Sequence, residues 1–382
     1  SALGRYEYFG NTDWFKELYK DRIPSTEQSV SVSGGSEKAN FYLSGRYYFQ
    51  DGIFNDNTDK FNKYNLRAKG EVAIKPWLKV QNNFELSNYT YTFPMLADRD
   101  NQTIWRMMDL LSFPMATIYN PDGTFSHTGV YSGIGAFKAG NNESKTTDIY
   151  FRNTVALEAK VLKDQLKLRT DFTYSRETNK EKRVNNFVDY STAPGVTARL
   201  GRSLLQQLSS DRSYLAANFT AEYNRTFNNL HHLKVLGGMN VETAHYEIFN
   251  ASRDGLLNDQ RPDFNLMDGL NYTITGGGNE WAYRGLFYRV NYDFKDRYLI
   301  ELDGRYDGSS KFPSSQRYGF FPSVSAGWRI SGENFMQASR NWLSDWKIRA
   351  SYGSLGNGNV EPYRYLEQMG VSKMSVILNG VQ

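Results

Sequence analysis

The sequence of 382 residues contains no cysteine, which excludes disulfide scaffolds, thiol catalysis and thiolate metal sites. It also contains no apolar run of about 18 residues or more, so we expect no transmembrane helix. The first residues, Ser1–Arg5, lack the basic stretch and apolar core of a signal peptide. We therefore expect that a leader was removed or that the chain begins within a longer protein.

A strong charge of either sign is missing as well. The 45 Lys and Arg residues nearly balance the 41 Asp and Glu residues, which leaves a net charge of +4. No basic block stands out along the chain, so nucleic acid is not an expected partner.

Aromatic residues, in contrast, are abundant: 27 Tyr, 24 Phe and 7 Trp make up 15% of a chain that is 23% charged. A transmembrane β-barrel combines these properties, because one face of each strand meets lipid, the other meets water, and rings gather at both interfaces. A β-rich extracellular domain that binds carbohydrate could have the same composition. Composition alone leaves both classes open.

Apolar and polar residues alternate along several segments, as they do in a strand with one face toward lipid. In 39–50, one row holds apolar or small residues and the other is mostly polar. The segments 64–75 and 298–307 repeat the pattern. Soluble antiparallel sheets alternate too, so one such strand decides little.

The lengths of the connections are more informative. We predict twelve strands, near 28–34, 38–50, 62–75, 78–91, 148–161, 166–178, 213–227, 232–249, 282–294, 297–308, 319–331 and 346–355. Short turns alternate with long connections at 51–61, 92–147, 179–212, 250–281 and 309–318. The connection 332–345 is expected to hold a small helix around Phe335 to Trp342. Barrels with tight periplasmic turns and long outer loops produce this alternation.

Several motifs follow one another in a recognisable order. They are Asn11-Thr12-Asp13-Trp14, the stretch 31–42 with Gly34-Gly35, Gln50-Asp51-Gly52-Ile53, the stretch 289–298, Gly304–Phe312 with Tyr306-Asp307-Gly308-Ser309-Ser310, Gly319–Ser323, Ala326–Ser331 and Ile348–Gly353. In order and spacing, this series resembles the barrel of SusC/RagA-type TonB-dependent transporters. The resemblance extends from about residue 11 to residue 358 and is looser between 92 and 281.

The resemblance implies an all-β fold: a transmembrane antiparallel barrel of 22 strands, of which this chain supplies about twelve. It assigns 1–27 to a lead-in segment, 28–358 to the barrel, and 359–382 to an outer loop or the next strand. No plug, TonB-binding box or final strands are recognisable, so we expect an internal fragment.

The resemblance also implies a function and partners. It predicts TonB-dependent import of glycans or peptides across the outer membrane of a Gram-negative bacterium. The implied partners are a SusD-like surface lipoprotein, the TonB complex and the lipid bilayer. A passive porin and a structural or adhesive barrel remain alternatives, since the segments that would distinguish them are not recognisable here.

We interpret the motif residues as determinants of the fold. Gly34 and Gly35 are expected to allow positive φ in a tight turn. Asp307, Ser309 and Ser310 are expected to begin a loop by bonding nearby backbone amides. Gly276-Gly277-Gly278 lacks the Lys-Ser/Thr of a phosphate loop, so we interpret it as a flexible part of an outer loop.

No catalytic constellation is apparent. The four histidines are His127, His231, His232 and His245. His231 and His232 are adjacent in a short turn and face apart, which does not suit an ordinary zinc site. No serine stands in a Gly-x-Ser-x-Gly motif. We predict no enzyme, no metal and no cofactor.

The long connections 92–147 and 250–281 carry rings, carboxylates and amides that could bind a sugar or a peptide. The candidate substrate contacts are Trp105, Tyr119, Tyr131, Asp263 and Trp281. The alternative is that the loop aromatics pack the loops onto one another.

Overall fold

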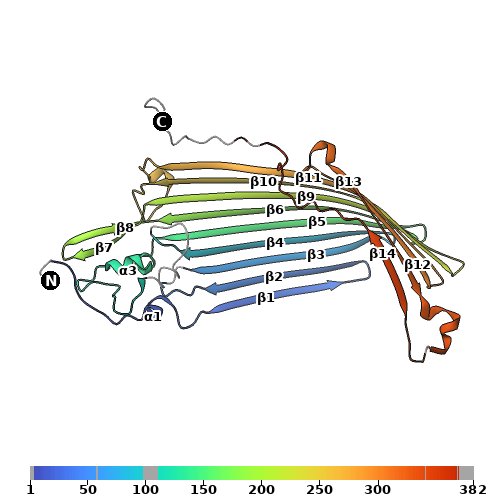
Figure 1. Ribbon diagram of the computed structural model, residues 1–382, viewed down its shortest axis with the longest axis horizontal. Coiled ribbons are helices and arrows are strands. Elements are labelled where there is room, and N and C mark those ends of the chain that lie inside the picture. The colour runs from blue at the N-terminus through green and yellow to red at the C-terminus, as the bar shows by residue number, and fades with distance from the viewer. Residues whose placement is uncertain (1–3, 57–58, 98–110, 340, 368, 370–382) are drawn as a thin grey trace. The chain divides into compact units, whose positions relative to one another are not determined.

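The structure is a computed structural model that describes residues 4–56, 59–97, 111–339, 341–367 and 369, and it is mostly β-structure (Figure 1). The strands are β1 (Ser25–Gly35), β2 (Ala39–Asp51), β3 (Lys60–Lys75), β4 (Leu78–Pro94), β5 (Glu143–Val161), β6 (Leu166–Asn185), β7 (Val188–Ala193), β8 (Val196–Leu200), β9 (Leu204–Phe227), β10 (His231–Asp254), β11 (Tyr272–Phe294), β12 (Tyr298–Ser309), β13 (Tyr318–Arg329) and β14 (Lys347–Gly353). The helices are α1 (Trp14–Leu18), α3 (His127–Tyr131), α4 (Ile134–Ala139) and the 3-10 helices η1 (Phe264–Leu266), η2 (Ser314–Gln316), η3 (Ile330–Gly332) and η4 (Asn334–Ser339). No helix in these ranges has the length and apolarity needed to cross a membrane.

Twelve strands form one sheet in which each strand pairs with the next along the chain. The order is β1-β2-β3-β4-β5-β6-β9-β10-β11-β12-β13-β14, and β7 and β8 form a separate two-stranded hairpin. The predicted antiparallel sheet of twelve strands is thus confirmed. A sheet with only sequential neighbours needs no crossover connection, so tight turns can join its strands.

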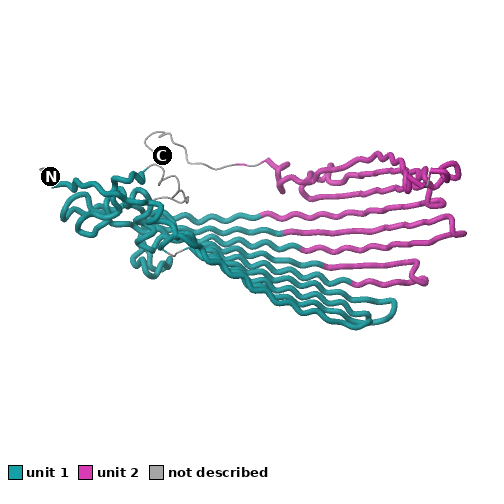
Figure 2. The backbone as a smooth tube through the Cα atoms, turned by 90° about the horizontal axis from the view of Figure 1, so that it is seen from below, with its two compact units in different colours: residues 1–156, 173–214, 245–278 teal, residues 157–172, 215–244, 279–382 magenta. Residues whose placement is uncertain are grey.

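The chain divides into two compact units (Figure 2). Unit 1 comprises 1–156, 173–214 and 245–278; unit 2 comprises 157–172, 215–244 and 279–382. We describe each unit by itself.

In unit 2, the pairing register separates an apolar row from a polar row. Across β11–β14, one row is Val290, Leu302, Val324 and Tyr352. The adjacent row, whose side chains point to the opposite face, is Asn291, Glu301, Ser325 and Ser351. The apolar row is exposed at Leu302 and Val324. A sheet face of this kind is suited to lipid, as the sequence alternation predicted.

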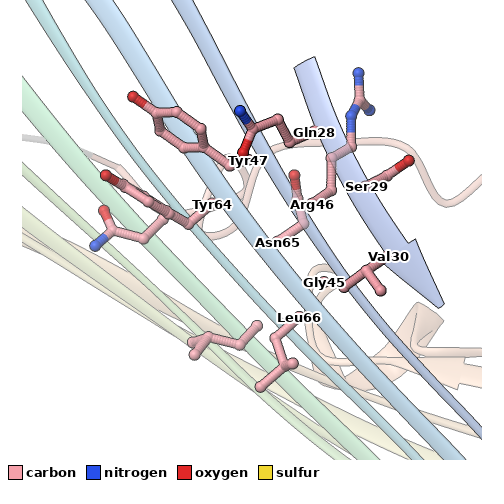
Figure 3. Close-up of a pocket in the computed structure, with 11 residues that line it drawn as sticks. Gln28, Ser29, Val30, Gly45, Arg46, Tyr47, Tyr64, Asn65 and Leu66 are labelled. Carbon is pink, nitrogen blue, oxygen red and sulfur yellow. The ribbon is translucent and has the colours of Figure 1, made fainter. Parts of the chain in front are cut away.

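Unit 1 repeats the arrangement. Across β1–β4, Val30, Gly45, Leu66 and Leu86 form one row, and Ser31, Ser44, Arg67 and Glu85 form the row on the other face. A hollow of about 560 Å³ lies over Gly45, where the missing side chain leaves a gap between Val30 and Leu66 (Figure 3). Because this hollow opens among apolar row residues, we interpret it as a surface that lipid chains would cover and not as a substrate site.

Two short turns place polar residues in the left-handed backbone region. Asn228 and Asn229 have φ of 51° and 53°, and Lys295 and Asp296 both have φ of 55°. Two consecutive residues with positive φ match the right-handed twist of the flanking strands in a two-residue hairpin. Asn and Asp tolerate this region better than most residues, which explains the polar composition of these turns.

The prediction that Gly34 and Gly35 adopt positive φ was wrong. Both glycines lie in β1, and neither is among the residues with positive φ. A Cβ on Gly35 would lie 2.7 Å from the Ala39 carbonyl oxygen, and one on Gly34 would lie 3.1 Å from the Phe41 ring. The glycines permit a close approach of the two strands just before the turn.

Several strands extend well beyond their predicted ends. β9 begins at Leu204 and β11 at Tyr272, so the connections predicted at 179–212 and 250–281 are shorter, and 179–212 also contains β7 and β8. The glycines 276–278 lie in β11 and not in a flexible loop, which corrects that prediction. A Cβ on Gly278 would lie 2.5 Å from the Tyr246 carbonyl oxygen, so glycine allows the strand to approach its neighbour.

The helix predicted near 335–342 is present as η4, a 3-10 helix at Asn334–Ser339. Residues Asn120–Gly123 form a turn, in which the Gly123 amide donates to the Asn120 carbonyl at 3.0 Å and Gly123 has φ of +84°.

The assignment of the two faces makes a quantitative prediction. In the full-length protein, Leu302→Arg should lower the free energy of unfolding in a bilayer by about 2–4 kcal/mol, because the charge would enter lipid. The matched variant Ser325→Arg adds the same charge on the polar face beside Glu301. It should cost less than about 1 kcal/mol. Urea titration in vesicles measures both. A larger cost for Ser325→Arg would mean that the faces are reversed.

Candidate functional site

The long connections of unit 1 fold into a packed assembly beside the strand ends, visible at the left of Figure 1 around α1, α3 and the β7–β8 hairpin. We call residues 4–20, 111–142 and 188–200 the loop cluster. Its main core contains Trp14, Leu18, Ile134 and Phe137, all buried, and these residues pack with the buried Phe54 from the connection between β2 and β3. A second core joins Val130 and Ala136 to Val188 and Tyr190 of β7. The loop cluster therefore has its own hydrophobic cores.

The Asn-Thr-Asp-Trp motif joins the lead-in segment to the segment 113–116. The Thr12 amide donates to the Pro114 carbonyl at 2.8 Å, and the Thr12 hydroxyl donates to the Ala116 carbonyl at 2.6 Å. The buried Trp14 donates its indole N–H to the Phe113 carbonyl at 2.9 Å. Asp13 caps α1 by accepting from the Lys16 amide at 3.1 Å. Asn11 is exposed.

Asn120 connects three segments and was missed by the sequence analysis. Its Oδ1 accepts from the Tyr8 hydroxyl at 2.5 Å. Its Nδ2 lies 3.0 Å from the carbonyl oxygens of both Phe125 and Ser191. The residue is buried, so its amide must be satisfied by these partners. The only signal in the sequence is that Asn120 begins the turn motif Asn120-Pro121-Asp122-Gly123.

The predicted contact residues occupy different places. Tyr119 is partly exposed, and its ring stacks on Phe125 with centroids 5.1 Å apart. Tyr131 lies in α3 and stacks on His127 at 4.1 Å. The structure thus brings Tyr119 and Tyr131 into the loop cluster. Trp105 lies outside the described residues.

The other two candidates lie elsewhere. Asp263 is the N-cap of η1 and accepts from the Asn265 amide at 2.8 Å. Trp281 lies in β11 in unit 2, with the Lys311 ammonium 5.2 Å from its ring centroid. Neither belongs to the loop cluster.

The motif at 306–310 lies in unit 2 at the end of β12. Tyr306 stacks on Tyr318 at 5.5 Å. Ser309 accepts from the Lys311 amide at 3.3 Å and Ser310 from the Ala282 amide at 2.8 Å, so both serines bond backbone amides. Asp307 differs from its predicted role, because its carboxylate accepts from the Arg305 guanidinium at 3.1 Å within the strand. A Cβ on Gly308 would clash with the Tyr318 ring at 2.1 Å.

One group of possible metal ligands occurs within the described ranges: His232, Asp293 and Asp296, whose ligand atoms lie within 4.8 Å of one another. His231 points elsewhere and hydrogen-bonds the Tyr292 hydroxyl at 2.7 Å. The side chain of Asp296 is 73% exposed, and zinc in a structural site takes four ligands. We assign no ion to this group.

Comparisons with known proteins agree on one family. The sequence profile described as “TonB dependent receptor-like, beta-barrel” matches residues 112–365. TonB-dependent receptor P26 of Formosa agariphila is 28% identical, over 98% of this chain and 36% of that protein. TonB-dependent receptor SusC of Bacteroides thetaiotaomicron is 24% identical, over 93% and 36%. The RagAB peptide importer in its 'open-open' state superposes with a TM-score of 0.77 at 22% identity, over 97% of this chain and 41% of that one. The chain therefore spans about a third to two fifths of the length of these proteins.

The contact between the lead-in segment and the turn at 120–123 should depend on pH. The Tyr6 hydroxyl donates to the Asp122 carboxylate at 2.5 Å. This bond raises the pKa of Tyr6 to about 12 and holds the pKa of Asp122 below its usual range. The Tyr6–Asp122 hydrogen bond should be fully formed at pH values between 3.8, the ordinary pKa of Asp122, and 10.0, the ordinary pKa of Tyr6. It should be lost as pH falls through the lowered pKa of Asp122, and as pH rises from 10.0 through about 12.

Ultraviolet absorbance of phenolate measures this directly in the full-length protein. The absorbance difference between wild type and Tyr6→Phe, which reports the phenolate of Tyr6, should appear with a pKa of about 12. In an Asp122→Asn background, the same difference should move toward 10.0. A wild-type difference that already titrates at 10.0 would show that the bond does not form.

Proposed function

Because the family profile matches residues 112–365, the chain belongs to the TonB-dependent receptor-like β-barrel family, and we propose that its protein imports oligosaccharides or peptides across the outer membrane of a Gram-negative bacterium. The observation that carries the proposal is the two-faced sheet: an apolar row suited to lipid and a polar row suited to a water-filled lumen. The peptide importer among its structural neighbours and SusC among its relatives support active import.

We propose that import is driven by the TonB complex, acting through a segment of the protein outside this chain. A SusD-like surface lipoprotein is the proposed outer partner. The loop cluster and lead-in expose large apolar side chains: Phe9 at 84%, Phe15 at 71%, Phe113 at 57% and Met115 at 60%. Exposed apolar side chains of this size on neighbouring segments support a protein contact at this surface.

Substrate contacts are proposed at the rings near the strand ends. Tyr119 is the best placed, since it is partly exposed on the loop cluster. Tyr131 packs against His127 and Tyr190, so less of its ring is available to a substrate. Trp105, Asp263 and Trp281 remain proposed contacts as well. No catalytic role is proposed, because no nucleophile and base come together in the sites described above.

Dependence on TonB tests the proposal. Uptake of labelled short oligosaccharides and of labelled peptides is measured in cells that carry the full-length gene, lack it, or lack TonB. We expect uptake of one substrate class to disappear in both deletion strains, while a small solute that diffuses through other porins enters normally.

Two results would contradict the proposal. Uptake that survives loss of TonB but not loss of the gene would indicate a passive pore. Uptake that survives both deletions would indicate a structural or adhesive barrel.

A further inference from the structure

A polar groove lies at the ends of β9, β10 and β11 in unit 1, apart from the loop cluster. Its volume is about 710 Å³, and its lining includes Gln206, Asn250, Ser252, Asp254, Tyr272 and Thr273. Along β10, Asn250, Ser252 and Asp254 share the face of Asn240, because alternate residues point the same way. Asn240 lies 3.4 Å from the Arg305 guanidinium, next to Asp307, on the polar face of the sheet. The groove therefore opens on the face that is suited to water.

Hydrogen bonds hold the side chains of the groove in defined orientations. Gln206 Nε2 donates to Asn250 Oδ1 at 2.9 Å. The Asp254 carboxylate accepts from the Asn271 amide at 3.2 Å and from Asn271 Nδ2 at 2.6 Å. The hydroxyls of Ser252 and Thr273 have no side-chain hydrogen bond to another residue of the described chain. They are available to a ligand, while the amides beside them are already oriented.

The rim of the groove is fixed by the loop between β10 and β11. Gly255 has φ of +79°, which favours glycine, and its amide donates to the Ser203 carbonyl at 3.0 Å. The Leu256 amide donates to Ser203 Oγ at 2.6 Å. Beneath this loop, Leu205 and Met267 are buried with Val184. A groove with anchored walls spares a ligand much of the entropic cost of ordering them.

The chemistry of the lining selects a class of ligand. Amides, hydroxyls, one carboxylate and the Arg202 guanidinium supply the polar groups of the lining, and these groups pair with the many hydroxyls of a sugar. Tyr272 adjoins Thr273 in β11, so its exposed ring points to the opposite face of the sheet. A peptide of mixed sequence would also need apolar pockets for its side chains, and the lining supplies mainly polar groups.

We propose that this groove is an oligosaccharide-binding subsite on the import route. The inference rests on the proposed function and deepens it, because it favours a carbohydrate over a peptide and names the residues that recognise it. Ser252 and Thr273 donate to sugar hydroxyls, and Asn250 and Asp254 accept from them.

The test uses the full-length transporter in detergent, with two probes: a pool of short oligosaccharides from partial hydrolysis of starch, xylan, laminarin and pectin, and a tryptic digest of casein. Native mass spectrometry identifies the bound species. Ser252→Trp fills the groove and should weaken binding of the selected oligosaccharide at least about tenfold. Thr273→Val removes one hydroxyl at nearly constant volume and should weaken it about three- to tenfold. Thr243→Val, an exposed strand position that does not line the groove, should leave binding unchanged.

Unchanged oligosaccharide binding by Ser252→Trp would overturn the inference, as would binding of casein peptides alone or of neither pool. Heat-modified gel mobility shows that each variant has assembled, and Thr273→Val keeps the test valid if Ser252→Trp does not assemble. The deletion of TonB distinguishes the two proposals. If wild-type uptake requires TonB and Ser252→Trp imports normally, the groove assignment fails while the transport function stands. If wild-type uptake does not require TonB, the proposed TonB-dependent import is contradicted, whatever the result for the groove.

Discussion

Pairing of backbone groups between neighbouring strands is the constraint on which the rest of the structure depends. Lipid offers no partner to a peptide N–H or C=O, so a chain that crosses it with strands must satisfy these groups inside the sheet. Sequential antiparallel pairing from β1 to β14 does so with tight turns. Once the register is set, each side chain is assigned to a face. The rows through Leu302 and Glu301 then follow from the sequence alone.

Under our proposal that the sheet crosses the outer membrane, the length of the strands separates a membrane part from an outer part. A strand needs about 9–11 residues to cross the hydrocarbon core, whereas β9 and β10 each have 24 residues. The surplus carries the chemistry at the strand ends: Gln206 in β9 and Asn250, Ser252 and Asp254 in β10. The sheet thus supplies rigid elements on which a binding surface can be held, which favours more accurate positioning than mobile loops would.

The same division explains which features could be predicted from the sequence. The membrane part alternates apolar and polar residues, so all twelve strands and their short turns were predicted. β11 begins with Tyr272-Thr273-Ile274-Thr275 and continues with three glycines, 276–278, which carry no side chains that could alternate. The start of β11 was therefore placed ten residues too late. Asn120 and the polar groove could not be predicted, because each depends on contacts between segments distant in the sequence. The β7–β8 hairpin is local, and its turn at Pro194-Gly195, where Gly195 has φ of 74°, is a signal that the sequence analysis did not use. The hydrogen bonds that join Thr12 and Trp14 to 113–116 also link distant segments and could not be predicted either.

The central claim is that one face of the sheet meets lipid and the other meets water. Single cysteines, placed in turn at each position of β12 in this cysteine-free chain, can carry a spin label in the full-length protein in vesicles. Collision with oxygen reports lipid, and collision with a water-soluble nickel chelate reports water. The account predicts that the two signals alternate out of phase, with oxygen strongest at Ile300 and Leu302 and the nickel chelate strongest at Glu301 and Asp303. Signals without a period of two residues, or with the opposite phase, would contradict it.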